Sequence, residues 1–326
     1  EMLHRSLDLF SVVAAEKCLQ LNVEVEPQAH MHLIGDSLRL TQIINNLLSN
    51  AIKFTESGGV KLKVELLSTN DNSTELRFIV SDSGIGMTEE QQQLVLQPFT
   101  QADMGTTRRY GGSGLGLPIC VSLLYLMNSR LEVSSEPGRG SSFSFDLKLG
   151  HSAGARRYAD LSLTPQDMLL VSDDLELQGL IGQYLLNWGV QLKTLEFGGE
   201  SAALLGGLEG GEYTLLLVDM TTPDHVEGTI RCCHQWMVHN ARDDILVLDR
   251  FGMSADTRFS DISPTFVPYP MTPSRLFDCL SLRRKHSLAM GASLVDSARR
   301  IAAHLRGIRL LLAEDVYSNQ IIALDF

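Results

Sequence analysis

Two asparagines and a lysine share a stretch of the chain that has the pattern of an amphipathic helix. Asn46 and Asn50 are four residues apart, so a helix would carry them on the same face. Asparagine lowers helix propensity, and two on one face therefore indicate a task. Their amide oxygens suit Mg²⁺, and Lys53, one turn from Asn50, could neutralise phosphate charge. A solvated helix face would show the same spacing, so these residues alone leave both interpretations open.

An aspartate and two glycines follow the predicted strand 75–80. The carboxylate of Asp82 could accept a hydrogen bond from the amino group of an adenine. Gly84 and Gly86 would let the backbone approach a base closely. An aspartate and glycine in this order are also the usual composition of a plain turn.

A polar loop and a glycine cluster occupy residues 97–116. Arg108 and Arg109 lie in the loop and could reach phosphates from a movable lid, although the composition also fits an ordinary loop. The cluster runs directly into a predicted helix, and bare N–H groups at such a helix start bind phosphate. The cluster lacks the Gly-Lys-Ser or Gly-Lys-Thr of a P-loop. Its residues are Gly112, Ser113, Gly114, Leu115 and Gly116.

Alternating helical and strand patterns supply the scaffold for these residues. Apolar residues recur at helical spacing over 38–54, and a second apolar helix is predicted over 115–127. Strand patterns lie at 60–66, 75–80, 131–133 and 142–147. These elements predict an α/β sandwich over residues 1–150, in which helices pack on one face of a mixed sheet.

The rest of the chain has a different organisation. A linker is predicted at 151–164, and a doubly wound parallel sheet of the flavodoxin-like kind over 165–283. A second linker, 284–307, precedes a buried strand that would open another α/β domain at 308–326. The predicted strands of the parallel sheet are 168–171, 190–195, 215–218, 245–248 and 266–267.

Composition narrows the class of protein. The formal net charge of −12 over 326 residues argues against a nucleic-acid partner, which would require a basic face. The five cysteines form no CxxC pair, so a reducing compartment is expected. No stretch reaches the roughly 20 apolar residues of a membrane helix. We expect a cytoplasmic segment of a longer protein, one that could be anchored in a bacterial inner membrane through segments outside this chain.

The four motifs, in this order, resemble the N, G1, F and G2 boxes of the ATP-binding domain of sensor histidine kinases. Gln97-Pro98-Phe99 begins the third, and residues 134–145 are similar to the closing hairpin of that family. The resemblance implies the Bergerat-type sandwich of the GHKL group, with ATP and Mg²⁺ as ligands and the glycine cluster around the phosphates. It assigns Mg²⁺ to Asn50 with Asn46 assisting, phosphate to Lys53, the vicinity of the base to Phe54, and the adenine amino group to Asp82.

The resemblance also bears on whether the γ-phosphoryl group of ATP is transferred to an acceptor or released by hydrolysis. ATPases of this fold place a glutamate one turn before the Mg²⁺-binding asparagine, where it activates water. Here that position is Asn46, whose amide is no base. A histidine kinase would instead hand the γ-phosphoryl to a histidine on a preceding dimerisation hairpin, and His4 does not fit that acceptor. The alternatives are a GHKL-type ATPase and an ATP-binding scaffold without transfer.

Residues 165–283 resemble, more weakly, a receiver domain. Asp173 and Asp174 match its acidic pair, and Asp219 matches its phospho-acceptor. Asp249 stands where a hydroxyl is expected, and Tyr269 stands about where a lysine is expected, which removes a charged partner of the acceptor and adds repulsion. We therefore expect a degenerate receiver that is not phosphorylated and that docks or binds a small-molecule or protein ligand.

The last segment looks like the opening of an intact second receiver, with Glu314 and Asp315 as its acidic pair. Together these parts predict a hybrid histidine kinase of a two-component phosphorelay. Its expected partners are its own histidine-bearing hairpin and a downstream receiver or phosphotransfer domain.

Overall fold

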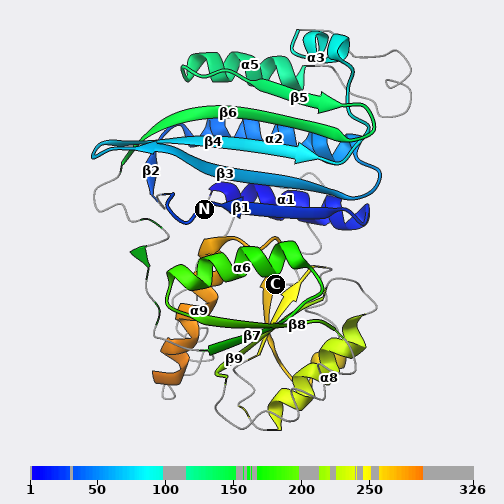
Figure 1. Ribbon diagram of the computed structural model, residues 1–326, viewed down its shortest axis with the longest axis vertical. Coiled ribbons are helices and arrows are strands. Elements are labelled where there is room, and N and C mark those ends of the chain that lie inside the picture. Colours follow the sequence, from blue (N-terminus) through cyan, green and yellow to red (C-terminus); the bar gives the residue numbers. More distant parts are fainter. Residues whose placement is uncertain are drawn as a thin grey trace, which may run out of the picture. The chain divides into compact units, whose positions relative to one another are not determined.

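The computed structural model describes residues 2–29, 32–97, 115–151, 157, 160, 161, 163, 167–197, 213–220, 225–238, 240, 245–250 and 257–288. Within these, residues 1–280 form one compact unit. That unit contains two sheets, one in each half of the chain (Figure 1).

The first sheet has six strands and is mixed. Its spatial order is β1-β3-β4-β6-β2, and β5 pairs with β6 as well. The pairing of β1 with β3 is parallel, and all other pairings are antiparallel. The strands are β1 (Gln20–Val25), β2 (Leu33–Ile34), β3 (Gly59–Thr69), β4 (Ser73–Asp82), β5 (Glu132–Glu136) and β6 (Gly140–His151).

One face of this sheet is covered by helices. Buried and less buried residues alternate along β3, β4 and β6, as expected when one face packs on a core. Helix α2 carries the longest buried stripe, and Asp36 caps its start by accepting a hydrogen bond from the Arg39 N–H at 3.0 Å. Figure 1 shows α2 running behind β4 and β6. The helices are α1 (Met2–Glu16), α2 (Ser37–Phe54), α3 (Glu89–Val95) and α5 (Gly116–Leu126).

The second sheet has five strands, all parallel, in the order β11-β10-β9-β7-β8. Numbered along the chain from β7, this order is 2-1-3-4-5, the flavodoxin-like arrangement. The strand order reverses between β7 and β9, so the carboxyl ends of these two strands flank the position where such sheets place ligands. The strands are β7 (Asp167–Val171), β8 (Gln191–Leu195), β9 (Leu215–Asp219), β10 (Ile245–Asp249) and β11 (Thr265–Pro268).

Two cores, one on each face, hold this second sheet. Successive residues of a strand point to opposite faces, so Leu170 and Leu217 belong to one core while Leu169 and Leu216 belong to the other. Helices α6 and α9 pack on the first face and α8 on the second. Figure 1 shows α8 on the opposite side of the sheet from α6. These helices are α6 (Leu175–Asn187), α8 (Val226–Met237) and α9 (Pro273–Leu288), and a short 3₁₀ turn, η5, spans Thr257–Phe259.

The predicted fold class, an α/β sandwich followed by a doubly wound parallel sheet, is confirmed. The predicted boundaries differ slightly from the observed elements. Strand β6 continues to His151, and helix α9 continues to Leu288, beyond the predicted domain limits of 150 and 283. The strand expected at 308–313 lies outside the described residues.

Candidate functional site

The two asparagines of the predicted nucleotide site lie on α2 beside the start of α5. A β-carbon built on Gly116 would stand 3.7 Å from the Asn46 Oδ1 and 3.9 Å from the Asn50 Nδ2. The two asparagines can lie in the middle of α2 because the opposite face of this helix is apolar and buried, which holds the helix in place. Among the described residues, the Asn50 side chain has no hydrogen-bond partner. Two amides and a helix start therefore converge.

Cys120 fixes the position of α5 against α2. Its thiol is hydrogen-bonded to Asn46 and lies 3.8 Å from the Ile43 carbonyl oxygen. Burial raises the pKa of the Cys120 thiol to about 11. The group therefore stays a neutral thiol at pH 7, and its role is packing rather than reactivity.

Lys53 and Phe54 end α2 beside the loop that follows β4. The Lys53 Nζ lies 4.9 Å from the centre of the Phe54 ring. The Phe54 carbonyl oxygen accepts a hydrogen bond from the Ile85 N–H at 3.3 Å. Phe54 thus contacts the loop after β4 through its backbone, a contact that the sequence did not predict.

Asp82 is the last residue of β4 and has one oxygen available. Its Oδ1 accepts hydrogen bonds from the Gly84 N–H at 2.9 Å and from the Ser141 N–H at 3.2 Å. Its Oδ2 has no hydrogen-bond partner within the described part of the chain. Burial raises the pKa of the Asp82 carboxyl above its usual value, while the two N–H bonds oppose that rise. The available oxygen can accept a hydrogen bond from a ligand.

The two glycines after Asp82 are required by close backbone contacts. A β-carbon on Gly84 would lie 2.3 Å from the Phe54 carbonyl oxygen. Gly86 has a φ of +66°, and a β-carbon there would lie 2.0 Å from the carbonyl oxygen of Glu136. Any larger residue would push this loop away from α2 or from the β5–β6 hairpin, so the course of the loop depends on both glycines.

The structure describes only part of the predicted phosphate-binding residues. The lid arginines Arg108 and Arg109, and Gly112, Ser113 and Gly114 of the glycine cluster, lie outside the described residues. The described end of the cluster, Leu115 and Gly116, is the N-cap and the first residue of α5. Gly116 is the described cluster residue that approaches the two asparagines.

The second predicted site lies at the carboxyl ends of β7 and β9. Asp219 is fully buried, and its Oδ2 accepts a hydrogen bond from the Ser172 hydroxyl at 2.8 Å. Asp174 caps α6, and its Oδ1 accepts from the Leu177 N–H at 2.9 Å. Asp173 points elsewhere, since its Oδ1 accepts from the Phe197 N–H at 2.7 Å. The structure thus brings Asp174 and Asp219 together and leaves Asp173 apart.

One charged residue of this second site was missed by the sequence analysis, which expected the charged partner of Asp219 to be lost. Arg250 follows β10, and its guanidinium contacts both Asp219 and Asp174 at 2.7–3.0 Å. Tyr269 stands beside this arginine, with the guanidinium carbon 4.2 Å from its ring centre. The expectation of a missing cation is therefore wrong: an arginine after β10 supplies the charge. No local sequence pattern marks Arg250, because its partners are 31 and 76 residues away.

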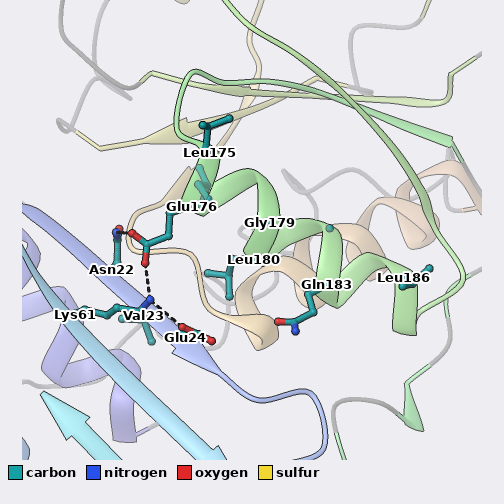
Figure 2. A pocket seen from close by; sticks show the side chains of 12 residues that line it. Asn22, Val23, Glu24, Lys61, Leu175, Glu176, Gly179, Leu180, Gln183 and Leu186 are labelled. Atoms are coloured by element: carbon teal, nitrogen blue, oxygen red, sulfur yellow. Dashed lines mark hydrogen bonds and ion pairs between the residues drawn. The ribbon is translucent and has the colours of Figure 1, made fainter. Parts of the chain in front are cut away.

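A cavity of about 440 Å³ is lined by β1, β3 and α6 (Figure 2). Its one lysine, Lys61, has its ammonium 2.9 Å from the Glu24 carboxylate and 2.5 Å from the Glu176 carboxylate. Burial lowers the pKa of Lys61, but the carboxylates of Glu176 and Glu24 raise it more, to a net value above the usual one. Figure 2 shows Lys61 between the two carboxylates. This charge is already balanced, so the cavity is a poor site for an anionic ligand.

One family model matches the part of the chain that carries the first site. The family described as histidine kinase-, DNA gyrase B- and HSP90-like ATPase matches residues 35–151, which include Asn46, Asn50, Asp82 and Gly116. Residues 35–151, which match that family model, are called the ATPase-family domain below. Among all the residues that the structure describes, no helix is long and apolar enough to cross a membrane.

Two proteins that are similar to this chain are named histidine kinases. The chain is 36% identical over 225 residues to sensor histidine kinase AruS of Pseudomonas aeruginosa, covering 68% of this chain and 22% of AruS. It is 34% identical over 243 residues to hybrid signal transduction histidine kinase K of Dictyostelium discoideum, covering 68% and 20%. The predicted resemblance to hybrid sensor histidine kinases is thereby confirmed, while the chain spans only about a fifth of these two relatives.

A solved structure shares the fold over nearly the whole chain. Full-length ShkA, crystallised in complex with AMPPNP, superposes with a TM-score of 0.60 at 24% identity, covering 99% of this chain and 63% of ShkA. At this identity the likeness shows a common fold for the ATPase-family domain and the parallel sheet that follows it.

Proposed function

We propose that residues 1–150 bind Mg·ATP and donate its γ-phosphoryl group to a histidine on a dimerisation hairpin outside this chain. The protein would be a hybrid sensor histidine kinase of a two-component phosphorelay. The relatives that carry that name support this activity, as does the ATP analogue AMPPNP in the ShkA crystal.

One observation carries the proposal: the amides of Asn46 and Asn50 meet the start of α5, while Asp82 keeps one oxygen available. The available Asp82 oxygen would accept the adenine amino group. Asn50, whose amide has no hydrogen-bond partner among the described residues, would hold Mg²⁺, with Asn46 assisting. When bound, Mg²⁺ supplies positive charge that offsets the charge on the phosphates.

The residues assigned to phosphate contact would complete the site. Lys53 would neutralise phosphate charge from the end of α2, and Phe54 would lie beside the base. Arg108 and Arg109 would approach the phosphates from the lid, and the glycine cluster up to Gly116 would surround them. Each contact positions the γ-phosphoryl group, which is the main contribution of protein to phosphoryl transfer.

The residue types at this site favour transfer over hydrolysis. Water attack would need a general base one turn before Asn50, and the residue there is Asn46, whose amide cannot accept the proton. In transfer, an imidazole nitrogen of the acceptor attacks the γ-phosphorus. The bond to the β–γ bridging oxygen breaks, and ADP leaves with that electron pair. The acceptor histidine thus supplies the nucleophile.

We assign the remaining parts of the chain as follows. Residues 165–283 act as a degenerate receiver that regulates or docks, through a protein or small-molecule ligand. Residues 308–326 open a second receiver, and 151–164 and 284–307 connect the domains. A downstream receiver or phosphotransfer domain would take the phosphoryl group from the histidine. The segment would work in the cytoplasm.

Calorimetric titration with ATP in the presence of Mg²⁺ tests binding, and incubation with labelled ATP and the hairpin domain of the same protein tests transfer. Asn50→Ala should lower Mg²⁺-dependent ATP affinity at least tenfold, whereas Gln42→Ala, an exposed change on the same helix, should not. Wild-type chain should label the hairpin with an acid-labile phosphoryl group. Tight ATP binding without labelling would instead favour a scaffold, and equal affinity of both variants would refute the site.

A further inference from the structure

A buried arginine occupies the acidic pocket at the carboxyl ends of β7 and β9. The Arg250 Nε donates to the Asp219 Oδ1 at 2.7 Å. One of its terminal nitrogens donates to the Asp219 Oδ2 at 3.0 Å and to the Asp174 Oδ2 at 2.8 Å. The guanidinium thus grips Asp219 with two parallel hydrogen bonds and bridges it to Asp174, the geometry in which arginine binds carboxylates most strongly.

This ion pair is shielded from water. The side chain of Asp219 is 0% exposed, that of Arg250 5% and that of Asp174 10%. An ionised carboxylate at such depth is strongly disfavoured unless a positive charge compensates it. Arg250 is the cation that contacts Asp219 within the described residues, and the stability of the ionised pocket therefore depends on it.

Both oxygens of Asp219 are already engaged. Oδ1 accepts from Arg250, and Oδ2 accepts from Arg250 and from the Ser172 hydroxyl. Tyr269 closes the pocket further, because its ring lies against the guanidinium with a centre-to-carbon distance of 4.2 Å. No group of three metal-ligating side chains converges in the described residues. A divalent cation entering here would have to displace the arginine.

We propose that Arg250 is a resident internal cation that takes the place of a divalent metal ion in this pocket and closes Asp219 to phosphoryl groups. The charge that a metal ion would bring is built into the chain. The state of this half of the protein is then fixed by its own ion pair and does not respond to Mg²⁺ or to phosphodonors.

The two tryptophans of the chain provide a specific probe. Trp188 and Trp236 are the only tryptophans in the sequence, both lie in this half, and each is 1% exposed. Thermal unfolding followed by tryptophan fluorescence in the absence of ATP therefore reports on the domain that contains Arg250. Wild-type protein should unfold at the same temperature with no Mg²⁺ and with 20 mM Mg²⁺.

Removing the arginine charge should create a response to Mg²⁺. Arg250→Met should lower the midpoint in metal-free buffer, and Mg²⁺ should raise it again by roughly 7 °C if about 20 mM ion binds with a Kd near 1 mM. Lys193→Met is the matched control, since Lys193 is an exposed cation 5.6 Å from the ring centre of Tyr213. This control should change neither the midpoint nor its insensitivity to Mg²⁺.

A double variant separates an internal cation from a salt bridge that only adds stability. Arg250→Met combined with Asp219→Asn removes both charges, so its midpoint should recover above that of Arg250→Met, and its response to Mg²⁺ should be lost. The double variant still tests the proposal if Arg250→Met alone does not fold. A wild-type midpoint that rises with Mg²⁺ would overturn the proposal. So would additive losses in the double variant, or its failure to fold.

Discussion

Replacing Asp82 by asparagine should reverse the base preference of the nucleotide site. The asparagine Oδ1 can still accept from the Gly84 and Ser141 N–H groups, so the loop keeps its hydrogen bonds. The group that faces the ligand changes from an acceptor oxygen to a donor NH₂. An adenine amino group would then meet a second donor in place of a charged acceptor.

The expected loss of ATP affinity follows from the loss of one hydrogen bond to a charged group. Such a bond contributes about 2–3 kcal/mol when its loss leaves a donor unpaired, which corresponds to roughly a 30- to 150-fold weaker Kd for ATP. ITP carries a carbonyl oxygen where ATP carries the amino group, and that oxygen can accept from the new NH₂. Asp82→Asn should therefore bind ITP more tightly than ATP, whereas wild type should prefer ATP.

The same substitution should not destabilise the fold. Burial raises the folded-state pKa of Asp82 above the unfolded value, so this group contributes stability at low pH that is lost as pH rises through the folded pKa. At pH 7 the buried charge is a net cost, which asparagine removes. The unfolding midpoint, followed by far-UV circular dichroism, should stay the same or rise. As the pH is lowered, the ATP affinity of wild type should begin to fall at a higher pH than it would if Asp82 had the pKa of an ordinary aspartate.

Titration of ATP and ITP into wild type, Asp82→Asn and the control Asp71→Asn tests the reasoning. Asp71 is an exposed aspartate in the turn before β4, and its replacement should change neither affinity. An Asp82→Asn protein that binds ATP within twofold of wild type, with an unchanged preference over ITP, would show that Asp82 does not read the base.

Three further predictions concern the frame of the site. Leu47→Ala, which empties a fully packed position of α2, should destabilise the first half by about 2–5 kcal/mol in denaturant unfolding. Gly86→Ala should weaken ATP binding and lower stability by at least about 1 kcal/mol, because φ is +66° and the Glu136 carbonyl blocks the new methyl group. Arg77→Ala breaks a partly exposed ion pair with Asp146 and should cost no more than about 1 kcal/mol.

The parts of the fold with strong local periodicity could be predicted from the sequence. The seven buried positions of α2 are those of the predicted apolar stripe, because helical spacing alone decides which residues face the core. The buried strands β7, β9 and β10 are continuous apolar runs, typical of a parallel sheet covered on both faces. Strand β1 was not predicted, although the alternation of Leu21, Val23 and Val25 is visible in the sequence.

The contacts that complete the two sites could not be read from the sequence. The Ser141 N–H reaches Asp82 across 59 residues, because β4 and β6 pair in one particular register. Arg250 reaches Asp219 because β10 and β9 are neighbours with parallel register. Sequence patterns identify which residues could perform chemistry, but strand order decides which of them meet.

The most direct test of the central claim follows the γ-phosphoryl group of labelled ATP. We predict that this chain releases little phosphate on its own and labels the hairpin histidine when the hairpin domain of the same protein is added. The label should depend on Mg²⁺ and on Asn50. Steady phosphate release by the chain alone, at a rate that the hairpin does not change and without labelling it, would contradict the account and indicate an ATPase.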